Sequence, residues 1–96
     1  MQYVHRTSSA PDAVIARAAS FFAGRLAPVA EGARRRSWSG GPGQLVLTVE
    51  AEGGHYTRVT VRTDQPGESE LDKLAKRFLA EVHLLAHPEH PLRGAY

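Results

Sequence analysis

The chain has 96 residues, of which 42% are apolar, and a formal net charge of +2. This length suits one small globular domain whose core leaves little room for a deep enclosed active site. The absence of cysteine excludes disulfides and thiolate metal sites, and the absence of a long apolar run or a signal peptide predicts a cytoplasmic protein without a membrane span.

Basic and acidic residues are unevenly distributed along the chain. Residues 1–48 carry six arginines against two acidic residues, whereas residues 49–96 carry six basic residues against eight acidic ones. This distribution allows a modest basic patch, but it does not indicate a strongly nucleic-acid-like domain. Ten arginines, two lysines and no asparagine fit a thermophile, although a GC-rich genome would give the same arginine bias.

The first part of the chain predicts a short strand followed by an amphipathic helix. Residues 3–7 alternate in type, which is typical of a strand. Ser9, a proline at position 11 and an acid three residues after Ser9 then resemble a helix start with a capping box. An apolar stripe at helical spacing predicts that the helix continues to about Leu26.

Glycine and proline mark the next boundaries. Residues 27–32 are predicted to be a connector. Residues 34–39 are predicted to be a strand that ends at the glycine-rich turn 40–43. That turn lacks the Lys-Ser/Thr continuation of a phosphate loop and precedes a strand instead of a helix, so a plain turn is favoured.

The hairpin at residues 44–63 is the clearest local signal, because apolar and polar residues alternate in both of its arms. A two-residue turn would set Val49 opposite Arg58 and mix the two faces. The three-residue loop Gly53-Gly54-His55 instead pairs Val49 with Val59 and Glu50 with Arg58, so that each face stays of one kind. We therefore predict the three-residue loop, with a glycine at positive φ.

Residues 68–86 are predicted to form the second helix, with apolar residues at three- and four-residue steps. We expect residues 1–88 to form a single compact domain and residues 89–96 to form a C-terminal tail. The predicted order is β-α-β-β-β-α. One-sided strands and amphipathic helices favour an α+β fold, a two-layer sandwich in which an antiparallel sheet carries both helices on one face.

A single long C-terminal helix against an antiparallel sheet resembles the helix-grip fold of START-like and polyketide-cyclase-like proteins, shortened by several strands. The element order also resembles one repeat of a TATA-binding-protein-like domain, short of one strand. Both resemblances concern element order alone, so they transfer no function.

Histidines near the end of the second helix form the sharpest constellation for chemistry. His83 and His87 are four positions apart, so they share a helical face and can chelate one divalent metal, with His90 or Glu89 as a third ligand. The glutamate of the HExxH motif is missing, however, and imidazoles at a helix end also suit the helix dipole. We therefore favour an exposed helix end without a bound metal or any other cofactor.

A second candidate contact surface combines arginine with aromatic residues. Its members are Arg34, Arg35, Arg36, Trp38, Tyr56, Arg58 and Arg62. Arginine can neutralise phosphates, and Trp38 or Tyr56 could stack on a base. Glu50 and Glu52 share the open hairpin face and can pair with Arg58, so cross-strand ion pairing is the favoured explanation and nucleic-acid binding is an alternative.

Catalysis has no recognisable basis in the sequence. No nucleophile–base pair stands out, the GxSxG pattern is absent, and Glu50 and Glu52 are better explained as ion-paired than as proton-transfer groups. We therefore expect a non-enzymatic protein with no catalytic residues.

Several apolar helix positions fall outside the predicted core stripes. Leu84 lies on the polar side of the second helix with Leu79 at its edge, and Val14 and Phe21 lie at the edge of the first helix. Because leftover apolar surface favours association, the leading hypothesis is a homodimer formed through a helix face or the hairpin edge.

An alternative function is the binding of a small apolar molecule between the sheet and the helices, as in helix-grip proteins. The space for it would lie near Phe22, Phe78 and Trp38. Given the chain length, we expect that space to be filled by side chains.

Overall fold

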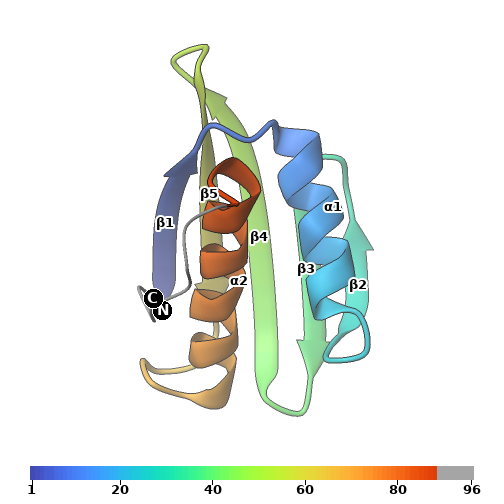
Figure 1. The fold of residues 1–96 in the computed structure, drawn as a ribbon. Coiled ribbons are helices and arrows are strands. Elements are labelled where there is room, and N and C mark those ends of the chain that lie inside the picture. The colour runs from blue at the N-terminus through green and yellow to red at the C-terminus, as the bar shows by residue number, and fades with distance from the viewer. Residues whose placement is uncertain (89–96) are drawn as a thin grey trace.

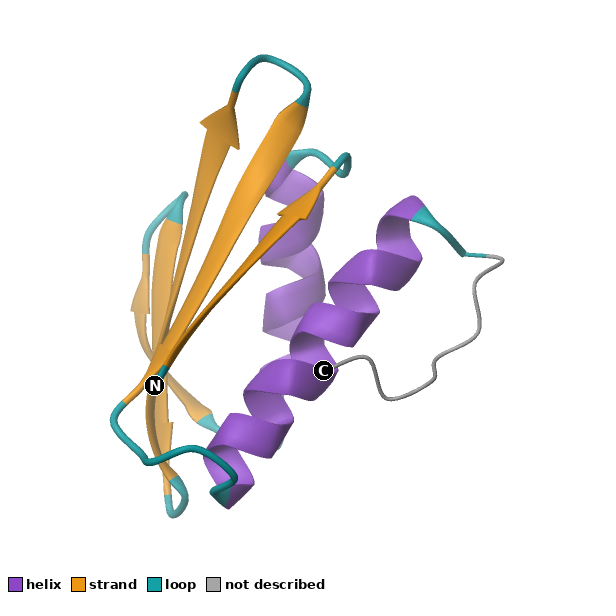
Figure 2. Cartoon of the chain, turned by 90° about the vertical axis from the view of Figure 1, so that its left-hand side faces the viewer, coloured by secondary structure: helices purple, strands orange, loops and turns teal. Residues whose placement is uncertain are grey.

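The protein has two layers, a five-stranded antiparallel sheet and two helices on one of its faces. The computed structural model describes residues 1–88. In chain order the elements are β1 (Gln2–Thr7), α1 (Pro11–Phe22), β2 (Ala27–Glu31), β3 (Arg35–Gly40), β4 (Gly43–Glu52), β5 (Tyr56–Thr63) and α2 (Glu70–Ala86). Both helices lie in front of the sheet (Figure 1), and the view turned by 90° separates the two layers (Figure 2). The predicted α+β sandwich is confirmed.

The sheet order is β1-β5-β4-β3-β2, with every neighbouring pair antiparallel. The order along the chain is β-α-β-β-β-β-α, one strand more than predicted. The extra strand is β2, which the sequence analysis took for a connector. All five of its residues are exposed, so no alternation of buried and exposed positions marks it, and only its pairing with β3 makes it a strand.

The hairpin formed by β4 and β5 has the predicted register. Val49 lies opposite Val59 and Glu50 opposite Arg58, and the three loop residues 53–55 follow the last pair of the ladder. Both loop glycines have positive φ, 64° at Gly53 and 76° at Gly54. These angles suit glycine because it has no Cβ to clash with the backbone.

Helix α1 begins and ends differently from the prediction. It starts at Pro11, and no side chain caps it, so the predicted capping box at Ser9 is wrong. The Ser9 carbonyl instead accepts a hydrogen bond of 2.7 Å from Thr57 Oγ1 of β5, which ties this residue to the sheet. The helix ends at Phe22, earlier than predicted, because Ala23 leaves the helical region with ψ 133° and Gly24 continues the turn with φ +76°.

Helix α2 matches its prediction more closely. It runs from Glu70 to Ala86, and the Ser69 hydroxyl caps its start by accepting from the backbone N–H of Asp72 at 3.2 Å. No helix among residues 1–88 is long and apolar enough to cross a membrane.

The core lies between the two layers and takes residues from both helices and from β3, β4 and β5. It consists of Val14, Ile15, Ala18, Phe22, Leu26, Trp38, Leu45, Leu47, Val49, Val59, Val61, Leu71, Ala75, Phe78, Leu79 and Val82. The Phe22 ring centroid lies 4.8 Å from that of Trp38 and 5.2 Å from that of Phe78. These three rings fill the space that the sequence analysis considered for a small apolar ligand.

Two positions expected at the edge of the helix stripes are fully buried. Val14 and Leu79 have no exposed surface, so they belong to the core. Phe21 and Leu84 are half-buried. The surplus of apolar helix surface is therefore smaller than the sequence indicated.

Candidate functional site

One face of the sheet is not covered by the helices, and we call it the open face. Its residues alternate with the buried ones along each strand. They are Gln2, Val4 and Arg6 of β1, Arg35, Ser37 and Ser39 of β3, Gln44, Val46, Thr48, Glu50 and Glu52 of β4, and Tyr56, Arg58, Thr60 and Arg62 of β5. Small hydroxyl and β-branched side chains occupy its centre, and charged residues surround them.

The charges near the hairpin tip neutralise one another. Arg58 lies 3.2 Å from Glu50 Oε1 and 3.6 Å from Glu52 Oε2, and Arg6 of β1 pairs with Glu52 at 2.5 Å. The Arg6 contact, more than Arg58, lowers the pKa of the Glu52 carboxyl. The predicted cross-strand ion pairs of Arg58 are confirmed. They occupy an arginine that would otherwise be available to bind the phosphates of a nucleic acid.

The three consecutive arginines do not form one patch, because neighbouring strand residues point to opposite faces. Arg34 Nη1 pairs with Asp12 Oδ1 of α1 at 2.5 Å. Arg36 lies on the helix side of β3 and donates from Nε to the Gly32 carbonyl at 3.2 Å, whereas Arg35 lies on the open face. Trp38 is only 4% exposed, so its ring is not available to stack on a base.

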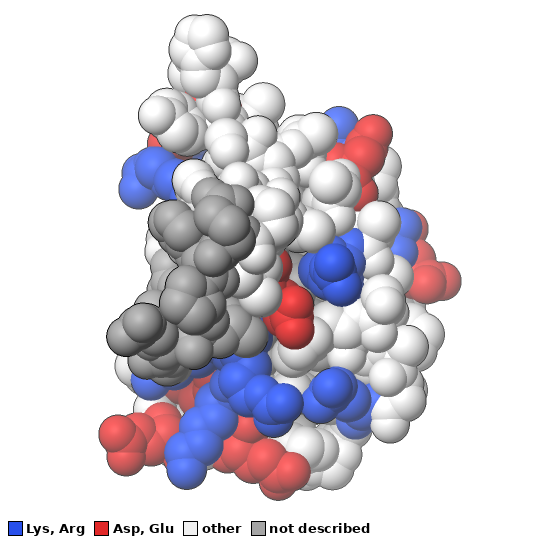
Figure 3. Space-filling model, viewed as in Figure 1, with Lys and Arg blue, Asp and Glu red and all other residues white. Residues whose placement is uncertain are grey.

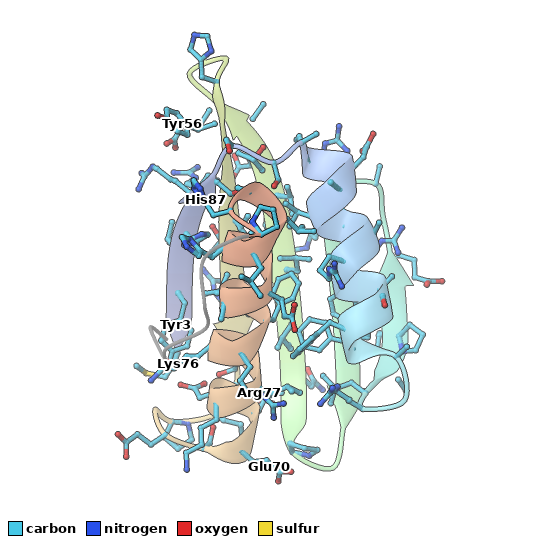
Figure 4. All side chains as sticks on the ribbon, viewed as in Figure 1. Tyr3, Tyr56, Glu70, Lys76, Arg77 and His87 are labelled. Carbon is cyan, nitrogen blue, oxygen red and sulfur yellow. The ribbon has the colours of Figure 1, made fainter. Side chains whose placement is uncertain are left out.

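A histidine cluster connects the end of α2 to β1. The His83 and His87 ring centroids are 4.9 Å apart, and the His5 ring of β1 meets the His83 ring edge to face at 6.3 Å. Together with Tyr56 and Arg6 they line a pocket of about 250 Å³. Figure 4 shows His87 at the upper end of α2, with Tyr56 above β1. His5 could not be assigned to this cluster from the sequence, because its proximity to His83 depends on the pairing of β1.

The metal hypothesis places two of its three ligands, His83 and His87, in this cluster. No group of three metal-ligating side chains among residues 1–88 is arranged to hold an ion. The third predicted ligand, His90, lies outside the described residues. Burial, and secondarily the neighbouring His83, lower the pKa of His5, so its imidazole favours the neutral form.

A buried carboxylate joins β1 and β5 to α2. Asp72 has no exposed surface. It accepts a hydrogen bond of 2.6 Å from Thr63 Oγ1 at Oδ1 and one from the Tyr3 hydroxyl at Oδ2. The hydrogen bond to this carboxylate is the main cause that raises the pKa of Tyr3 to about 12. Both carboxylate oxygens thus accept a hydrogen bond, and the group attaches strands β1 and β5 to α2.

The two edges of the sheet differ in how they are protected. At the β2 edge, Pro28 lacks an N–H, and the register with β3 shifts between Pro28 and Ala30. Proline and bulges are devices that prevent the addition of another strand. At the other edge, β1 pairs with β5 without interruption over six residues, and it contains neither proline nor a bulge. Val4 in its middle is 43% exposed.

Neither the comparison with models of protein families nor the comparison with curated proteins finds a match for this chain. Its fold and its surfaces therefore carry the functional argument.

Proposed function

We propose that this domain acts by association with a second copy of itself, without catalysis, and that the two copies join along their β1 strands. The observation that carries this proposal is the contrast between the β2 edge, which has a proline and a bulge, and the β1 edge, which has neither. In Figure 2, which looks at the β1 edge, the described helices stay on one side of the sheet and do not cross β1.

The backbone of β1 has hydrogen-bonding groups for a further strand. Met1 and Thr63 exchange two backbone hydrogen bonds, of 3.0 Å and 2.8 Å. In an antiparallel ladder the bonded pairs alternate, so the N–H and C=O groups of Gln2, Val4 and Arg6 point away from β5. Their side chains also lie on the open face.

Every symmetric antiparallel register about a twofold axis perpendicular to the sheet keeps the helices of both copies on the same side of the joined sheet. A twofold axis at Val4 pairs Val4 with Val4 of the second copy and Gln2 with its Arg6, which forms about six backbone hydrogen bonds. An axis at His5 forms about four such bonds and sets the two His5 imidazoles against each other. We therefore favour the register centred on Val4.

Three acidic residues with partners, Asp72, Glu50 and Glu52, give additional support to association over catalysis. Asp72 is enclosed by two hydroxyl donors, and Glu50 and Glu52 are ion-paired. Proton transfer requires a carboxyl group that can reach a substrate. The arginines considered for nucleic-acid binding are divided between the two faces of the sheet, because Arg35, Arg58 and Arg62 lie on the open face whereas Arg34 and Arg36 lie on the helix side, and this division argues against that alternative.

Sedimentation of the whole chain, with variants at the edge and on the face, tests the proposal. We expect a dimer at high micromolar concentration that Val4→Lys converts to a monomer, since an edge lysine opposes strand pairing. Val46→Lys places the same charge on the open face of β4, away from the edge, and should leave the dimer intact.

Val4→Pro provides a second edge variant. It removes an N–H that points outward, so the pairing of β1 with β5 should persist, as the fluorescence of buried Trp38 would report. A wild-type monomer would refute self-association. A dimer that is lost in Val46→Lys but kept in both Val4 variants would refute association through the β1 edge and favour a dimer in which the open faces pack together.

A further inference from the structure

A groove between α2, the segment that follows α1 and the turn between β3 and β4 collects positive charge. It measures about 400 Å³ and is lined by Arg25, Pro42, Glu70, Lys73, Leu74 and Arg77. Figure 3 shows lysine and arginine side chains gathered over the lower part of the helix layer, and Figure 4 shows Arg77 and Glu70 on the lower half of α2. The groove lies on the helix side of the molecule, away from the open face.

The three cations of this groove have no acidic partner within the described part of the chain. Among residues 1–88, none of the ion pairs involves Arg25, Lys73 or Arg77. Lys73 and Arg77 stand four positions apart on α2, an arrangement of like charges that destabilises a helix by about 0.2–0.5 kcal/mol. Three positive groups against the single carboxylate of Glu70 leave the groove with a net charge that a dianion would balance.

Arg25 is held in place for such a contact. Its Nε donates to the Phe21 carbonyl at 2.9 Å, and its Cζ lies 4.7 Å from the centre of the Phe21 ring. These two contacts restrict the orientation of the guanidinium, and among residues 1–88 they leave both terminal nitrogens available as donors. A fixed guanidinium fork matches the geometry of a phosphate and loses little entropy on binding.

We propose that this groove binds the dianionic phosphate group of a small organic ligand. Arg25 and Arg77 donate to the phosphate oxygens, and Lys73 contributes a further positive charge. Leu74 and Pro42 form an apolar wall that can contact the organic part of the ligand. This site is independent of the association proposed above, because it uses no residue of β1.

The test is a titration of the whole chain, at constant ionic strength, with inorganic phosphate and with phenyl phosphate, followed by amide chemical shifts. We expect saturable shifts confined to residues of the groove, and tighter binding of phenyl phosphate. Arg77→Gln should weaken binding about tenfold, the cost of one hydrogen bond to a charged group. Glu70→Gln should tighten binding severalfold, because it removes the opposing carboxylate.

Arg17→Gln on α1 is the matched control, since it removes the same charge outside the groove. It should change the dissociation constant by less than twofold. Shifts that do not saturate would overturn the proposal, and so would an Arg17→Gln effect as large as that of Arg77→Gln. Inorganic phosphate binding as tightly as phenyl phosphate would overturn the assignment of an organic ligand.

Discussion

Replacing the buried carboxylate of Asp72 tests how the sheet edge is attached to α2. Asp72→Ala removes the acceptor for the Tyr3 hydroxyl and for Thr63 Oγ1. A hydrogen bond to a charged group contributes about 1.5–3 kcal/mol. The loss is smaller than twice that value, because Thr63 keeps the Gln65 carbonyl at 3.3 Å and the half-buried Tyr3 hydroxyl can bond to water. We expect the free energy of unfolding to fall by about 2–4 kcal/mol.

Urea denaturation followed by the fluorescence of Trp38, the single tryptophan, measures this change. Asp12→Ala is the control, because Asp12 forms an exposed ion pair with Arg34 that is expected to contribute only about 0–1 kcal/mol. An Asp72→Ala midpoint indistinguishable from that of Asp12→Ala would refute the assigned role of the carboxylate.

Tyrosine titration offers an independent reading of the same contact. The pKa of Tyr3, about 12 in the folded protein, should return towards its ordinary value of about 10 in Asp72→Asn. Since the folded pKa is raised, the stability from this hydroxyl is fully present below pH ~10 and is lost as the pH rises towards 12. An unchanged Tyr3 titration in Asp72→Asn would contradict the assigned cause of the shift.

The remaining predictions concern the histidine cluster, one turn and the core. Because burial and the neighbouring His83 lower the pKa of His5 in the folded state, the free energy of unfolding should fall as the pH drops through ~6.5, before the carboxylates titrate. His5→Gln should reduce this pH dependence, as measured by denaturation midpoints across the range. An unchanged pH dependence in this variant would count against the role of His5. Gly43→Ala should lower the free energy of unfolding, measured by urea denaturation, by about 1–3 kcal/mol, because φ is +137° and the added Cβ would lie 2.6 Å from Asp64 Oδ1. Wild-type stability of this variant would mean that the turn relaxes freely. Phe78→Ala should lower the unfolding free energy by about 3–5 kcal/mol, and a loss below 1 kcal/mol would show that the core collapses around the gap.

The hairpin and its faces could be predicted from the sequence because the alternation is one-sided. A slip of one residue would bury Arg58 and expose Val59, so only one register keeps the valines inside. The strand β2 could not be predicted in this way. Its five residues are exposed, and its identity comes from hydrogen bonds to β3, which local composition does not encode.

The sites were harder to predict because they depend on contacts between distant segments. His5 meets His83 only because β1 lies beside β5 and under α2. The run of three arginines looked like one patch in the sequence, yet strand geometry separates it, and Arg34 is drawn to Asp12. The charge of the groove was equally hidden, because Arg25 follows α1 while Lys73 and Arg77 belong to α2.

The pairing of β1 with β5 also has a consequence for the order of folding. Met1 and Thr63, which are bonded to each other, are 62 positions apart in the chain. At a synthesis rate of about 5–20 residues per second, β1 leaves the ribosome several seconds before its partner strand. The meander from β2 to β5 consists of local hairpins and can form first, with β1 joining last. During the interval before its own β5 has emerged, β1 has no partner strand, and it can pair with the β5 edge of a neighbouring chain, with residues 8–10 as the hinge of a swapped pair.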